Sequence, residues 1–200
     1  MLLEMQVHKI AIKFFVEDDS KLTGGEFVPI VHSWIQSQLV PDHMLVDVAD
    51  YAHVQDGPGT VLVSHEANFY IDRGAGRLGL VYSRKQPAAG DFRERLRQAV
   101  IAALEACARL ENDPNLSGKL TFRTDEMLVQ LNDRLLAPNT PETFDQMRGD
   151  LQEILADLYG AADLRIEHKP SPATLFEVRI RASENRPVRE LLSRISAPAR

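Results

Sequence analysis

Two short turns, DGPG at 56–59 and RGAG at 73–76, constrain the fold of this chain more than any other feature of its sequence. They separate three runs, at 44–54, 60–71 and 78–85, in which apolar and polar residues alternate as they do in half-buried β-strands. Turns this short join neighbouring strands in antiparallel order, because a parallel connection needs a crossover of roughly a dozen residues or more. The sequence therefore predicts a three-stranded antiparallel meander.

The segments on either side of the meander predict one strand and two helices. Alternation over 8–16, which places His8, Ile10, Ile12, Phe14 and Val16 on one face, indicates a first strand. A capping box formed by Thr23 and Glu26 is expected to open a helix, and Asp91 is expected to open a longer one in the same way. Residues 1–111 are thus expected to form a strand, helix, meander and helix half.

The C-terminal part of the chain predicts a β-β-α-β-β unit over 119–196. We expect a tight hairpin at Asp125 and Glu126, a helix between Thr140 and Gly160, a second hairpin around KPSP, and a short terminal helix. Each half then has an antiparallel sheet whose apolar face needs a helical layer, which is the α+β class. The halves form either two units or a single compact domain.

Charge and cysteine content narrow the classes of partner and compartment. The chain has 23 Lys and Arg against 29 Asp and Glu, a net charge of -6, and lacks a long basic run, so nucleic acid is not the expected partner. The single cysteine, Cys107, lies in an apolar helical stripe and predicts a buried, unreactive thiol in a reducing compartment. Glu4, Lys9 and Lys13 interrupt the first apolar stretch, which predicts a cytoplasmic protein without a membrane segment.

A histidine, His65, stands where the strand pattern calls for an apolar residue. If DGPG is the turn and Gln55 pairs with Thr60, then Asp50 lies opposite His65. Both strands would then break their apolar alternation at the same place. The next turn would bring Arg84 to the same face.

This predicted cluster has two interpretations. It is either a buried polar group that fixes the strand register, or an enzyme site in which Asp50 orients His65 as a general acid or base and Arg84 binds an anionic substrate group. Ser64 cannot complete a hydrolase triad, because neighbouring residues of a strand point to opposite faces. With Arg84 beside the pair and no third ligand, neither a metal nor a cofactor is expected.

The other face of the meander is the second candidate site. Such a face is either simply solvated or a recognition surface in which tyrosines supply rigid contact area. We expect a binding or interaction protein, with a protein or a small molecule as the partner; the small-molecule enzyme is the alternative. The residues expected to form the contact face are Tyr51, His53, Ser64, Glu66, Asn68 and Tyr70.

Overall fold

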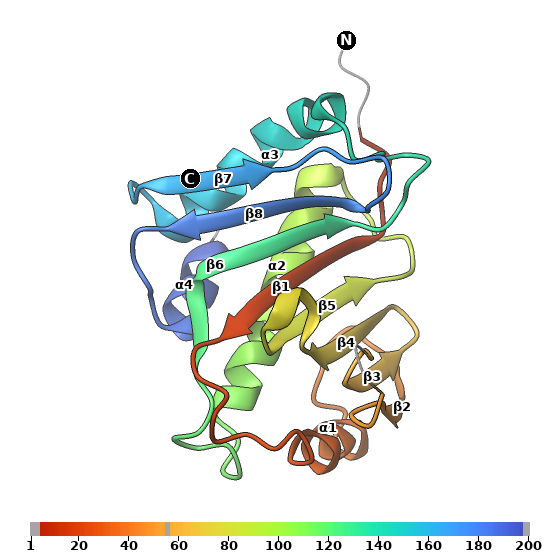
Figure 1. The fold of residues 1–200 in the computed structure, drawn as a ribbon, viewed down its shortest axis with the longest axis vertical. Coiled ribbons are helices and arrows are strands. Elements are labelled where there is room, and N and C mark those ends of the chain that lie inside the picture. Colours follow the sequence, from red (N-terminus) through yellow and green to blue (C-terminus); the bar gives the residue numbers. More distant parts are fainter. Residues whose placement is uncertain (1–4, 55–56, 198–200) are drawn as a thin grey trace.

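A computed structural model describes residues 5–54 and 57–197, and in these residues an eight-stranded antiparallel sheet packs against four α-helices (Figure 1). The strand order across the sheet is β2-β3-β4-β5-β1-β6-β8-β7. The strands are β1 (Ile10–Val16), β2 (Leu45–Asp50), β3 (Thr60–Ser64), β4 (Ala67–Asp72), β5 (Gly79–Arg84), β6 (Phe122–Leu131), β7 (Leu164–His168) and β8 (Phe176–Ala182). The helices are α1 (Phe27–Gln36), α2 (Phe92–Glu111), α3 (Pro141–Tyr159) and α4 (Val188–Ile195), with a short 3-10 helix η1 (Gly74–Gly76).

The two halves of the chain share this one sheet. β1 pairs with β5 on one side and with β6, from the C-terminal half, on the other. All the strand pairs are antiparallel, so the predicted α+β class is confirmed. The close pairing of β1 with β6 places side chains from both halves next to each other at the centre of the sheet.

The hydrophobic core lies between the sheet and the helices. Alternation in β1 turns Ile10, Ile12 and Phe14 toward this layer, where they are almost fully buried among residues of the four helices. α2 lies across β1 and β5 at the centre of this layer (Figure 1). Cys107 on α2 is fully buried there, as predicted, and burial raises the pKa of its thiol.

Local capping signals place the helix ends where the sequence predicts them. Asp91 and Glu94 form a reciprocal capping box at the start of α2, with hydrogen bonds of 2.8 and 3.0 Å. Thr140 caps α3, which ends at Gly160, where φ is 64°. Before α1 only half of the predicted box forms, because the Glu26 carboxylate accepts the Thr23 N–H at 3.1 Å but no bond from the Glu26 N–H to the Thr23 hydroxyl is found there, and the N-cap of α1 is Glu26 itself. No helix among the described residues is long and apolar enough to cross a membrane.

The predicted strand at 60–71 is wrong, because it is two strands joined by a hairpin. β3 ends at Ser64, the chain turns at His65 and Glu66, and β4 begins at Ala67. The buried Ser64 hydroxyl donates to the Ala67 carbonyl oxygen at 2.5 Å and accepts the Ala67 N–H at 3.0 Å. One side chain thus satisfies both backbone groups at the turn, and the meander has four strands.

The predicted hairpin at Asp125 and Glu126 is also wrong. β6 runs without a break through these residues, and the register with β1 shifts between Phe14, opposite Met127, and Phe15, opposite Arg123. A β-bulge of this kind accommodates extra residues in one strand without reversing it. The C-terminal unit is therefore β-α-β-β.

Candidate functional site

The predicted pairing of Asp50 with His65 is wrong. Asp50 pairs with Thr60, and β2 ends there. Its carboxylate accepts the N–H of Ala52 at 2.9 Å, and the Tyr51 N–H donates to the Gly59 carbonyl at 2.8 Å. The loop after β2 is therefore longer than the DGPG turn alone; the predicted partner of Thr60, Gln55, lies outside the described residues.

Asp50 and Arg84, two residues of the predicted acid–base cluster, make their side-chain hydrogen bonds to residues outside it. His65 is an exposed residue of the turn between β3 and β4. Arg84 lies at the end of β5, where its guanidinium donates to the Gln86 carbonyl at 3.0 Å and to the Tyr82 hydroxyl at 3.4 Å. Because Asp50 does not face His65, the pair on which the enzyme interpretation depends does not form.

The predicted contact face is assembled only in part. Asn68 and Tyr70 lie side by side on the sheet face opposite the helices, with the Asn68 amide donating to the Tyr70 hydroxyl at 2.9 Å. Ser64 is instead buried in its turn. Glu66 lies half-buried in the same turn, and its carboxylate accepts the N–H of Met44, which precedes β2. Tyr51 and His53 are exposed in the loop after β2.

This second face of the sheet carries no α-helix in the described residues and is called the open face below (Figure 1). The strand registers arrange its side chains in rows that cross the sheet. One row, running from β4 to β8, is Tyr70, Val81, Lys13, Leu128 and Arg179. The next row is Asn68, Ser83, Ala11, Gln130 and Glu177.

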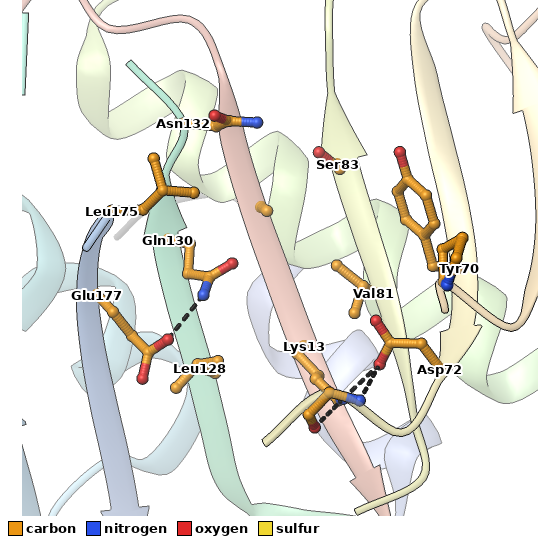
Figure 2. Close-up of a pocket in the computed structure, with 13 residues that line it drawn as sticks. Lys13, Tyr70, Asp72, Val81, Ser83, Leu128, Gln130, Asn132, Leu175 and Glu177 are labelled. Atoms are coloured by element: carbon orange, nitrogen blue, oxygen red, sulfur yellow. Dashed lines mark hydrogen bonds and ion pairs between the residues drawn. The ribbon is translucent and has the colours of Figure 1, made fainter. Parts of the chain in front are cut away.

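A cavity of about 310 Å³ lies on these rows (Figure 2). Ala11, Val81 and Leu128 supply its apolar surface, and Figure 2 shows Tyr70 and Ser83 along one side of it. A second cavity of about 560 Å³ shares Gln130, Leu175 and Glu177 with the first and reaches Arg179 and Arg181. We call the two together the open-face groove.

Lys13 fixes the wall of the groove and is not available to a ligand. Its side chain is 5% exposed, and its ammonium donates to Asp72 at 2.5 Å and to the Gly74 carbonyl at 2.7 Å (Figure 2). It also donates to the Arg77 carbonyl at 3.3 Å. All three ammonium protons therefore have acceptors. Burial lowers the pKa of Lys13, and the hydrogen bond and charge of Asp72 oppose this effect. The residue holds η1 against the open face.

The remaining polar groups of the groove can orient a bound molecule. Gln130 donates through its amide nitrogen to Glu177 at 2.7 Å, which fixes the amide and leaves its oxygen as an acceptor. The side chains of Ser83 and Asn132 line the same cavity (Figure 2). An apolar surface with a few placed polar groups is typical of small-molecule sites.

Sequence reasoning missed most of this groove. Ala11, Leu128 and Glu177 belong to strands that are distant in the chain, and they become neighbours only through the pairing of β1 with β6 and of β6 with β8. No pattern within one segment signals such a neighbourhood. The available signal was weaker: Lys13 and Gln130 interrupt apolar strands, and each proves to face the groove.

No group of three or more His, Cys, Asp or Glu side chains that could hold a metal ion occurs among the residues described. Comparison of the chain with known protein families, characterised proteins and solved structures finds no match. The function is therefore argued from the groove itself.

Proposed function

We propose that the protein binds a small organic molecule in the open-face groove. The observation that carries the proposal is the hollowed open face, with an apolar floor and polar side chains along its sides. The volumes of about 310 and 560 Å³ lie within the range of roughly 300–1,000 Å³ that is usual for ligand sites.

A small molecule fits this face better than a protein partner does. Stable protein interfaces bury roughly 800 Å² on each side and use large apolar or aromatic anchors at their centre. The large exposed apolar side chains of the described residues lie elsewhere, in the loop between α1 and β2, on β2, in the loop after β2 and in the loop after β6. They are Leu39, Met44, Val46, Tyr51, Val54, Leu135 and Leu136.

The groove supplies two kinds of interaction to its ligand. Val81 and Leu128 offer apolar area whose removal from water is favourable, at roughly 25 cal/mol per Å². Ser83, Gln130 and Asn132 offer hydrogen bonds that fix the orientation. Binding without chemistry is the function that we propose for these groups, because Lys13, the lysine beside Val81 and Leu128, already donates to three acceptors.

The test is an NMR screen of neutral fragments against ¹⁵N-labelled protein, repeated with a blocked groove. We expect saturable shifts at the amides of Val81, Ser83, Leu128 and Gln130. Ser83→Trp, which places an indole in the groove from a half-buried position, should abolish them.

The matched control is Gln152→Trp, which adds the same side chain at an exposed position on α3. This variant should keep the shifts. Fragments that bind only on the helix side, or equally well to both tryptophan variants, would refute the proposal. If Ser83→Trp does not fold, as judged by its spectrum, Ala11→Leu narrows the same floor and serves in its place.

A further inference from the structure

Three arginines converge on one carboxylate at the end of the open face. Arg77, Arg179 and Arg181 lie 2.7, 3.2 and 3.5 Å from the same oxygen, Oε1 of Glu126. Arg77 comes from the segment before β5, and the other two from β8. We call these three residues the arginine cluster; they are not needed for the apolar part of the groove.

The arginine cluster and the charged residues around it carry more positive charge than the carboxylates among them neutralise. The charged residues that line the second cavity or touch Glu126 or Glu167 are five cations and three carboxylates, so two positive charges are in excess. The cations are Lys169, Arg77, Arg165, Arg179 and Arg181, and the carboxylates are Glu126, Glu167 and Glu177. The neighbouring pairs Lys13 with Asp72 and Arg123 with Asp125 are each neutral.

The guanidinium groups are held in place before any ligand binds. The Glu126 side chain is only 5% exposed and anchors one side of each guanidinium. The Phe15 ring lies under Arg77 and Arg179, at 4.0 and 5.8 Å from its centroid. Each guanidinium has five N–H donors, and the side chains of Arg77, Arg179 and Arg181 remain 36%, 25% and 42% exposed. Donors are thus left to point at a ligand on the open face.

The cluster adjoins the apolar part of the groove. Arg179 and Arg181 line the second cavity, and Arg179 pairs with Leu128 of the first. Neighbouring strands lie roughly 4.8 Å apart, so a molecule with one charged and one apolar end can reach both.

We propose that the arginine cluster binds the phosphate group of a small organic phosphate whose body lies over Leu128. This inference rests on the function proposed above and names the class of ligand. A phosphate dianion balances the two excess charges and accepts paired hydrogen bonds from guanidinium forks, whereas a carboxylate balances only one charge. The phosphate takes the outward N–H groups that Glu126 leaves unused.

The experiment titrates the protein with phenyl phosphate, benzoate and benzyl alcohol, which share a ring and differ in charge. Phenyl phosphate should bind most tightly and shift the side-chain Nε–H signals of the three arginines as well as the Leu128 amide. Arg179→Gln should weaken the binding of phenyl phosphate by roughly tenfold or more, the effect of losing one hydrogen bond to a charged group. It should leave the binding of benzyl alcohol unchanged.

Arg148→Gln is the matched control, because it makes the same charge change on exposed α3, where Arg148 pairs with Asp145. It should leave phenyl phosphate binding unchanged. If Arg179→Gln lowers the thermal stability, Arg77→Gln tests the same site from another segment.

The outcomes separate this inference from the function on which it rests. The phosphate site would be overturned, and the groove left intact, if phenyl phosphate binds no better than benzyl alcohol. The same conclusion would follow if it binds equally well to Arg179→Gln and Arg148→Gln. In the opposite case, no neutral fragment binds, but phenyl phosphate still shifts the arginine Nε–H signals in Ser83→Trp. That result would support the anion site and refute the groove.

Discussion

Replacing Lys13 by methionine should destabilise the protein by about 3 kcal/mol, because it breaks a buried ion pair by removing one partner. The substitution leaves the Asp72 carboxylate, whose side chain is 21% exposed, without its cation, and leaves the Gly74 carbonyl without its donor. Removing one member of a buried pair costs roughly 3–5 kcal/mol. The lower end applies, because Asp72 keeps some water and still accepts the Gly74 N–H at 3.0 Å.

Urea unfolding followed by circular dichroism measures this loss. A decrease of about 3 kcal/mol corresponds to a melting temperature lower by roughly 6–12 °C in a protein of this size. The exposed residue Lys21 provides the control, and Lys21→Met should change the free energy of unfolding by less than about 0.5 kcal/mol.

The double variant Lys13→Met with Asp72→Asn tests the reasoning itself. It removes both charges and keeps an acceptor for the Gly74 N–H, so it should cost much less than the single change, about 1 kcal/mol. If the double variant is as unstable as Lys13→Met alone, or if the single variant loses less than about 1 kcal/mol, then Lys13 does not act through its buried charge.

Three further predictions concern single groups. Burial lowers the pKa of His168 in the folded state from its usual 6.5, so the unfolded state takes up the proton first as the pH falls. The free energy of unfolding should therefore decrease as the pH drops below that value. The melting temperature should depend less on pH in His168→Gln. Ser64→Ala should cost about 2 kcal/mol in urea unfolding, because both Ala67 backbone groups lose their partner in the turn, and a loss below about 0.5 kcal/mol would contradict this. The Cys107 thiol should react slowly with a thiol reagent in the native protein and quickly once unfolded, and rapid native labelling would show that α2 is not packed as described.

Features encoded by neighbouring residues were predictable from the sequence. The α+β class follows from short turns and from the change of hydrophobic period, and the ends of α2 and α3 follow from Asp91, Thr140 and Gly160. In each case the deciding interaction lies within a few residues along the chain.

Strand register was not predictable in this way, because a hidden turn changes every later pairing. His65 breaks the apolar alternation because it is a turn residue, whereas the sequence suggested a partner for Asp50 across two strands. Nothing in the apolar pattern distinguishes one long strand from a hairpin whose turn is closed by the Ser64 side chain.

The groove was out of reach of sequence reasoning for a different reason. Its floor joins Ala11, Val81 and Leu128, from three strands that become neighbours only in the folded sheet. Beyond this floor, the bulge between Phe14 and Phe15 shifts the register again, so that Phe15 pairs with Arg123. Sites of this kind depend on contacts between distant segments, which a single sequence does not specify.

A crystal structure of the protein with the neutral fragment that gives the largest NMR shifts tests the central claim most directly. We predict that the fragment lies on the open face against Ala11, Val81 and Leu128, with a hydrogen bond to Ser83, Gln130 or Asn132. A fragment bound on the helix side or along the edge of β2, with the groove holding only water, would contradict the claim that the open face is the binding site.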